Sequence, residues 1–100
     1  MQRVSTVMVV EDDFLLAAHL LELLEAADIN AIGPCFSAAQ AVEFAEQQRP
    51  NLVLMDIKLS GQRDGVSAAA EIWERFAIRS VFVTGNTDIA QSTRAAAAIL

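Results

Sequence analysis

The stretch from residue 4 to residue 27, VSTVMVVEDDFLLAAHLLELLEAA, decides the fold. Its first part, residues 4–10, is short, apolar and rich in β-branched side chains, which is typical of a buried parallel strand. Three acidic residues follow at once, and residues 14–27 are then rich in Leu and Ala and contain no Gly or Pro. Asp13 stands where a helix cap is expected. The stretch therefore predicts a strand followed directly by a helix.

The rest of the chain repeats this alternation. Further strands are predicted over 30–36, 52–55 and 80–83, and further helices over 37–48, over 66–77 and from Thr87 or Asp88 to Leu100. The strand at 30–36 contains Gly33 and Pro34, so we expect it at the edge of the sheet. Strands that alternate with helices predict one parallel sheet with helices on both faces and right-handed crossovers.

The helix over 66–77 has a regular apolar pattern. Apolar side chains recur at helical spacing, at Val66, Ala69, Ala70, Trp73, Phe76 and Ala77. This spacing predicts that the helix buries one face, with Trp73 and Phe76 packed in the core.

The length and composition of the chain indicate a folded domain and disfavour a membrane protein. A chain of 100 residues with 54% hydrophobic and 20% charged residues predicts one folded domain over residues 1–100. His19, Glu22 and Glu25 interrupt the most apolar stretch, which leaves no run of the roughly 18 residues that a membrane helix needs. The N-terminus also lacks a signal-peptide layout. We therefore expect a cytoplasmic protein with no membrane association.

The net charge and the single cysteine limit which binding partners and which metal ligands are expected. The formal net charge of -6 disfavours direct binding to nucleic acid, because phosphate backbones would be repelled. Cys35 is the only cysteine, so neither an internal disulfide nor a thiolate metal cage can form. Apart from His19, only oxygen ligands remain, and they favour a hard cation if a metal is bound.

Polar residues stand at the carboxyl ends of three predicted strands, where sheets of this kind bind ligands. Glu11 and Asp12 follow the first strand, Asp56 the third and Thr84 the fourth. Gathered carboxylates repel one another unless they share a divalent cation, and Mg²⁺ fits best because it leaves space for a phosphate. Asp56 is the candidate nucleophile for an aspartyl phosphate, and the Thr84 hydroxyl and Gly85 amide are candidate donors to the phosphoryl oxygens.

Four segments of the chain resemble the receiver domain of two-component response regulators. They are VVEDD at 9–13, LVLMDIKL at 52–59, DGV at 64–66 and VFVTG at 81–85. The resemblance implies a flavodoxin-like, doubly wound parallel sheet with strand order 2-1-3-4. It also implies a phosphorelay role, in which a histidine kinase or phosphotransfer protein is the partner and the domain is not a turnover enzyme.

The same resemblance assigns roles to individual residues. Asp56 is expected to be the phosphoacceptor and a ligand of Mg²⁺. Asp12 is expected to bind the ion directly, with Glu11 as its acidic partner, while Lys58 contributes a backbone carbonyl. Thr84 is expected to be the switch hydroxyl.

The sequence also departs from the family pattern, which continues with a fifth strand ending in Lys and a fifth helix. The chain ends at Leu100, so we expect a C-terminally short receiver domain with weakened phosphorylation. An uncovered apolar edge on the fourth strand predicts a homodimer, through that edge or through a swapped last helix. The alternative is a phosphorylation-independent dimerisation or interaction module that lacks the switch lysine.

A third function is disfavoured. A magnesium-dependent phosphatase or phosphotransferase with an aspartyl nucleophile would need a general acid two residues after Asp56, to protonate the leaving group. Lys58 occupies that position.

Overall fold

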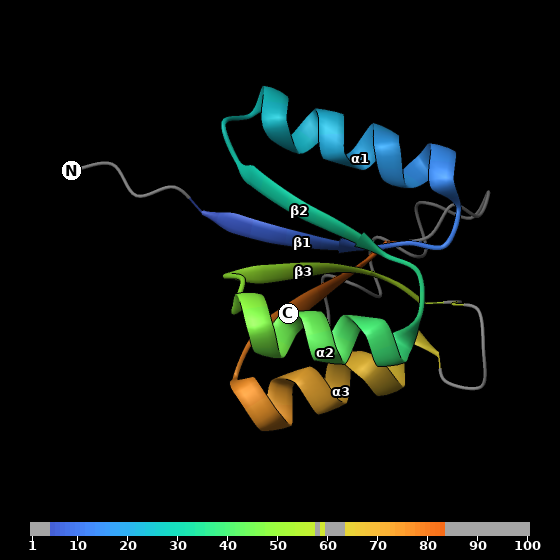
Figure 1. Ribbon diagram of the computed structural model, residues 1–100, viewed down its shortest axis with the longest axis vertical. Helices are drawn as coiled ribbons and strands as arrows, with labels where there is room; N and C mark the ends of the chain where they lie inside the picture. Colours follow the sequence, from blue (N-terminus) through green and yellow to red (C-terminus); the bar gives the residue numbers. More distant parts are fainter. Residues whose placement is uncertain (1–4, 58, 60–63, 84–100) are drawn as a thin grey trace.

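The computed structural model describes residues 5–57, 59 and 64–83. Strands and helices alternate along this part of the chain (Figure 1). The elements are β1 (Thr6–Val10), α1 (Phe14–Ala26), β2 (Asn30–Cys35), α2 (Ala38–Gln48), β3 (Leu52–Asp56), α3 (Gly65–Phe76) and β4 (Arg79–Val83). The helix predicted from Thr87 or Asp88 to Leu100 lies outside the described residues.

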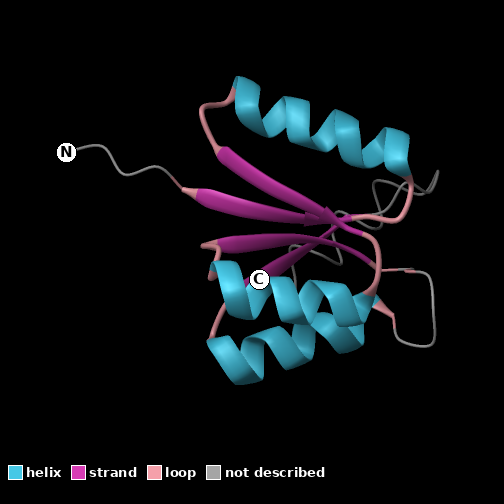
Figure 2. Cartoon of the chain, viewed as in Figure 1, coloured by secondary structure: helices cyan, strands magenta, loops and turns pink. Residues whose placement is uncertain are grey.

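All four strands form one parallel sheet in the order β2-β1-β3-β4. Helix α1 covers one face of the sheet, and α2 and α3 cover the other (Figure 2). This is the flavodoxin-like, doubly wound arrangement with strand order 2-1-3-4, and it confirms the prediction. Strand β2, which contains Gly33 and Pro34, lies at one end of the sheet as expected.

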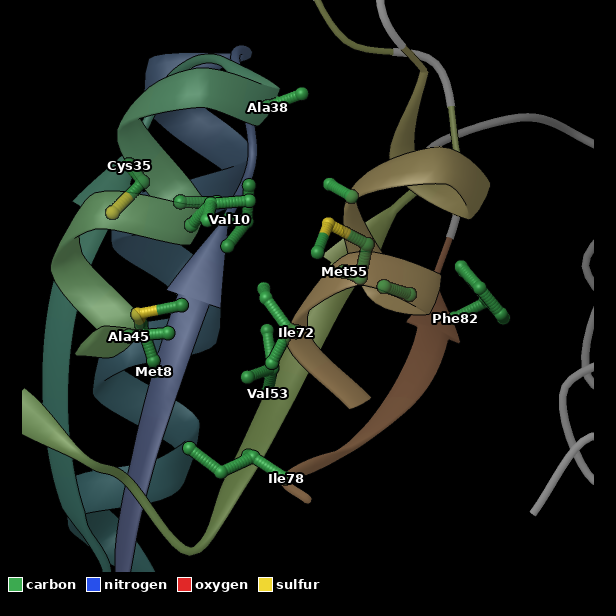
Figure 3. Close-up of a cluster of buried hydrophobic side chains, with 14 residues drawn as sticks. Met8, Val10, Cys35, Ala38, Ala45, Val53, Met55, Ile72, Ile78 and Phe82 are labelled. Atoms are coloured by element: carbon green, nitrogen blue, oxygen red, sulfur yellow. The ribbon is translucent and has the colours of Figure 1, made fainter. Parts of the chain in front are cut away.

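The main core lies between the sheet and helices α2 and α3 (Figure 3). Met8, Val53 and Met55 are fully buried on the central strands, and Ala45 and Ile72 meet them from the helices. Each large side chain buried in this way contributes roughly 1.5–3 kcal/mol to stability. The small alanines of α2 let that helix approach the sheet closely, which fixes both central strands and therefore their carboxyl ends.

Side-chain caps fix where the helices begin. Asp13 accepts hydrogen bonds from the Leu15 and Leu16 amides at the start of α1, at 3.0 and 3.2 Å. Ser37 caps α2 and Asp64 caps α3 in the same way. Two of these caps, Asp13 and Asp64, fix where the helices that follow β1 and β3 begin.

The buried face of α3 differs from the predicted one. Its buried residues include Ala68 and Ile72, whereas Trp73 is 47% exposed and carries the Arg79 guanidinium 4.9 Å from its ring centroid. Phe76 is half-buried against the core. The prediction for Trp73 is wrong because two overlapping apolar stripes run along this helix, and the stripe with the smaller side chains allows closer packing on the sheet.

Two further observations bear on earlier expectations. Cys35 is buried, and its burial raises the pKa of the thiol to about 11, so the side chain stays a protonated apolar group. Within residues 5–57, 59 and 64–83, no helix has the length and apolar character needed to cross a bilayer.

Candidate functional site

Three carboxylates converge where the two central strands end. Glu11 and Asp12 come directly after β1, and Asp56 is the last residue of β3. The two strands are neighbours, with Val10 opposite Met55, so the residues that follow them emerge side by side. One carboxylate oxygen from each of Glu11, Asp12 and Asp56 lies within 4.8 Å of the other two. The structure thus brings together the acidic residues that the sequence placed at strand ends.

Backbone contacts hold this cluster in place. The Glu11 amide donates to the Cys35 carbonyl at the end of β2, at 2.9 Å. The Asp13 amide donates to Glu11 Oε2 at 3.0 Å, so the residue that caps α1 also orients the Glu11 side chain. Glu11 and Asp56 are buried, with exposed fractions of 3% and 7%, while Asp12 is exposed. The cluster therefore has a buried floor and a side that is open to solvent.

The electrostatics of the cluster are unfavourable without a positive charge. The pKa of Glu11 is raised to about 7, mainly by burial and in addition by a hydrogen bond with Asp56 and by the charges of Asp56 and Asp12. The Asp13 amide acts in the opposite direction. Buried like charges at this spacing favour either a bound proton or a bound cation.

The donor set fits Mg²⁺. Carboxylate oxygens are the ligands that hard cations prefer, and Mg²⁺ binds through one or two carboxylates while it keeps several waters. The exposed Asp12 lies on the open side, where such waters and an anionic substrate have access.

Gly65 contributes to the site through its lack of a side chain. Its amide donates to the Ile57 carbonyl at 2.7 Å, and a Cβ built on Gly65 would lie 1.8 Å from the Asp56 carbonyl oxygen. Only glycine lets the first turn of α3 lie against the end of β3. Sequence reasoning placed the Asp64-Gly65 pair directly before the helix predicted over 66–77 and missed this contact with the backbone of Asp56.

The other predicted site residues lie outside the described part of the chain. They are Lys58, Thr84 and Gly85. Residue 83 is described, and Val83 at the end of β4 pairs in register with Asp56 at the end of β3. Thr84 is the next residue of the sequence.

Comparison with known proteins identifies the family. The sequence pattern of the response regulator receiver domain matches residues 7–99. The transcriptional regulatory protein PdtaR of Mycobacterium tuberculosis is 39% identical over 66 residues, which are 66% of this chain and 32% of PdtaR. The phyllosphere-induced regulator PhyR of Methylorubrum extorquens is 33% identical over 81 residues, which are 80% of this chain and 30% of PhyR.

Solved structures agree with this assignment. The signal receiver domain of a modulated diguanylate cyclase from Desulfovibrio desulfuricans G20 superposes with a TM-score of 0.79 at 31% identity, over 95% of this chain and 77% of that one. The chain belongs to the response regulator receiver domain family. It is a signalling module of the two-component type, and it spans about a third of the length of the curated relatives it matches.

Proposed function

We propose that the chain receives a phosphoryl group on Asp56 from the phosphohistidine of a histidine kinase or phosphotransfer protein, in a reaction that needs Mg²⁺. The observation that carries this proposal is the position of Asp56. Its side chain lies at the end of a central strand, and two further acids have carboxylate oxygens within 4.8 Å of its own. A carboxylate in such a group serves as a nucleophile once the surrounding negative charge is compensated.

The proposed transfer moves one phosphoryl group and conserves charge. A carboxylate oxygen of Asp56 attacks the phosphorus, the new P–O bond forms as the donor's P–N bond breaks, and the leaving imidazole takes up a proton. Asp12, Glu11 and the Lys58 carbonyl are the groups that would hold Mg²⁺ beside Asp56. When bound, the ion supplies positive charge that offsets the repulsion between the anionic nucleophile and the anionic phosphoryl group.

Two residues after β4 complete the proposed site. The Thr84 hydroxyl and the Gly85 amide would donate hydrogen bonds to the phosphoryl oxygens. The register between Val83 and Asp56 supports this role, because the chain leaves β4 at the level of the acceptor. Capture of the phosphoryl group by Thr84 would then bias the conformation that a downstream partner recognises.

The phosphoacceptor assignment is tested by measuring intact mass after incubation with a small phosphoryl donor and Mg²⁺. We expect the wild type to gain one phosphoryl group and Asp56→Asn to gain none. Asp28→Asn is the matched control, since Asp28 is exposed and has the positive φ of 63° that asparagine tolerates well. An adduct that survives in Asp56→Asn would refute the assignment, as would a wild type that gains no mass under conditions in which it is folded.

The cellular location and the output of this function are also proposals. We place the domain in the cytoplasm, where its kinase or phosphotransfer partner would act, with no direct role in nucleic-acid binding. The names of PdtaR and PhyR describe regulators, one of them transcriptional, which supports an output in gene regulation.

A second candidate function is a receiver-like module that acts by dimerisation alone. Among the described strands, β4 lies at the end of the sheet and pairs only with β3, and its Val81 and Val83 side chains are half-buried. We propose a homodimer through this edge, because an open apolar strand favours pairing with another strand. A swapped last helix is the other arrangement by which two copies would associate.

A further inference from the structure

Three arginine side chains gather at the end of the molecule opposite the acidic cluster. Arg49 follows the last residue of α2, Arg75 lies in the last turn of α3, and Arg79 begins β4. Helices α2 and α3 lie side by side, and their last turns are at the same end of the fold (Figure 1). These three are all of the Lys and Arg residues in the part of the chain that the structure describes. The described positive charge is therefore concentrated in one place.

Two aromatic rings of α3 lie under these guanidinium groups. The guanidinium carbons of Arg49 and Arg75 lie 4.7 and 4.9 Å from the centroid of the Phe76 ring. That of Arg79 lies 4.9 Å from the centroid of the Trp73 ring. A guanidinium that already rests on a ring loses little side-chain entropy when it binds an anion. We call these five residues the arginine–aromatic surface.

Arg75 differs from the other two arginines in its ion pairs. It contacts Glu71 at 3.0 Å and Glu46 at 3.5 Å, which ties α3 to α2. Arg49 and Arg79 are exposed, and neither forms an ion pair within the described residues. The Nε of Arg49 donates to the Glu46 carbonyl at 3.0 Å, which leaves its terminal amino groups for other acceptors. Two positioned guanidiniums therefore have donors left for carboxylates of another molecule.

We propose that the arginine–aromatic surface binds an acidic peptide segment of a partner protein. Separate carboxylates of the segment pair with Arg49 and Arg79, and an apolar side chain of the segment packs on Trp73. The Trp73 side chain is 47% exposed, so it offers apolar surface beside both arginines. Tryptophan and arginine are also the residue types that dominate binding energy at protein interfaces.

Charge favours a peptide over the other possible occupants. Glu46, Glu71 and Glu74 border the surface, and the formal net charge of the chain is -6. The closely spaced phosphates of a nucleic acid would meet these glutamates, whereas peptide carboxylates can be spaced to reach only Arg49 and Arg79. A second copy of the chain would bring its own charge of -6, which opposes its approach.

A peptide titration tests the proposal in the full chain. The probe is a blocked pentapeptide that has one leucine between two pairs of glutamates. Trp73 reports its binding, because it is the only tryptophan of the chain and belongs to the surface. We expect a saturable change of Trp73 emission with this peptide, and no change with the same peptide in which glutamine replaces every glutamate.

Substitutions separate local recognition from overall charge, with affinities measured by calorimetry. Arg49→Gln and Arg79→Gln should each weaken binding of the glutamate peptide by about fivefold, the size expected when an exposed ion pair is removed. Arg79→Lys should also weaken it, because lysine lacks the planar fork of donors. Ala18→Glu is the matched control, since it lowers the net charge by the same single unit on exposed α1, on the other face of the sheet (Figure 2).

Several results would overturn the proposal in proteins that are folded by circular dichroism. The wild type could fail to bind the glutamate peptide at millimolar concentration, or bind the glutamine peptide equally well. Ala18→Glu could weaken binding as much as Arg79→Gln does, which would reduce the effect to overall charge. Tighter binding of a short single-stranded DNA at the same salt concentration would assign the surface to nucleic acid. A dimer that Arg49→Gln disrupts would assign it to a second copy.

Discussion

At the scale of single residues, the surroundings of Glu11 raise the pKa of its carboxyl group. It is buried beside two other carboxylates, and a backbone amide holds its side chain toward them. The sequence was sufficient to place these acids together, because parallel neighbouring strands deliver their carboxyl ends to one edge. The electrostatic consequence needed the structure, since burial of Glu11 and exposure of Asp12 cannot be read from adjacent positions in a sequence.

Glu11 predicts a pH dependence of stability in the metal-free protein. Its pKa is raised from 4.5 to about 7, so between these values the folded state holds a proton that the unfolded chain has released. The stabilising effect is complete below about pH 4.5 and is lost as the pH rises through about 7. Urea unfolding from pH 4.5 to pH 8 should show a steeper loss of stability in the wild type than in Glu11→Gln.

The contrary result would be equal pH slopes for the two proteins, which would mean that Glu11 titrates at its ordinary value. Addition of Mg²⁺ at pH 8 gives a second comparison. The ion should stabilise the wild type, because it binds the folded state and compensates the ionised carboxylates.

At the scale of elements, the contact between α3 and the end of β3 positions Asp56, the proposed acceptor. Sequence patterns were enough to predict that a helix follows the Asp64-Gly65 pair. They were not enough to reveal that Gly65 lies against the Asp56 backbone, because the position of a glycine in the sequence does not identify the chain segment packed beside it. The error at Trp73 has a similar origin, since helical periodicity alone does not choose between overlapping apolar stripes.

Gly65→Ala should therefore disturb both stability and the acceptor. The new methyl group would meet the Asp56 carbonyl oxygen at 1.8 Å, so α3 or the end of β3 must move. We expect the free energy of unfolding to fall by roughly 1–3 kcal/mol, the usual cost of overpacking, and phosphorylation of Asp56 to slow. Urea unfolding and the rate of mass gain measure these two effects.

Glu74→Ala is the control for this variant, because Glu74 is exposed on the same helix. Its stability should stay within about 0.5 kcal/mol of the wild type. A Gly65→Ala protein with wild-type stability and wild-type phosphorylation would contradict the positioning role given to Gly65.

At the scale of the whole molecule, the alternation of strands and helices was enough to predict the parallel sheet and its two helical layers. Among the described strands β4 pairs only with β3, and this gives a prediction at this scale. Light scattering at tens of micromolar protein should detect a dimer of the wild type, and Val81→Lys should weaken it, because charged residues on an edge strand oppose pairing. Gln48→Lys, at the exposed end of α2, is the control for the added charge. A wild type that stays monomeric would exclude the edge dimer.

The most direct test of the whole account is chemical mapping of the phosphorylated residue. Borohydride reduces an aspartyl phosphate to homoserine, and peptide sequencing by mass spectrometry then locates the change. We predict homoserine at position 56 alone, formed only when both the phosphoryl donor and Mg²⁺ were present. Reduction at any other acid, or none at position 56 in a protein that carries the added phosphoryl mass, would contradict the assignment of Asp56 as the acceptor.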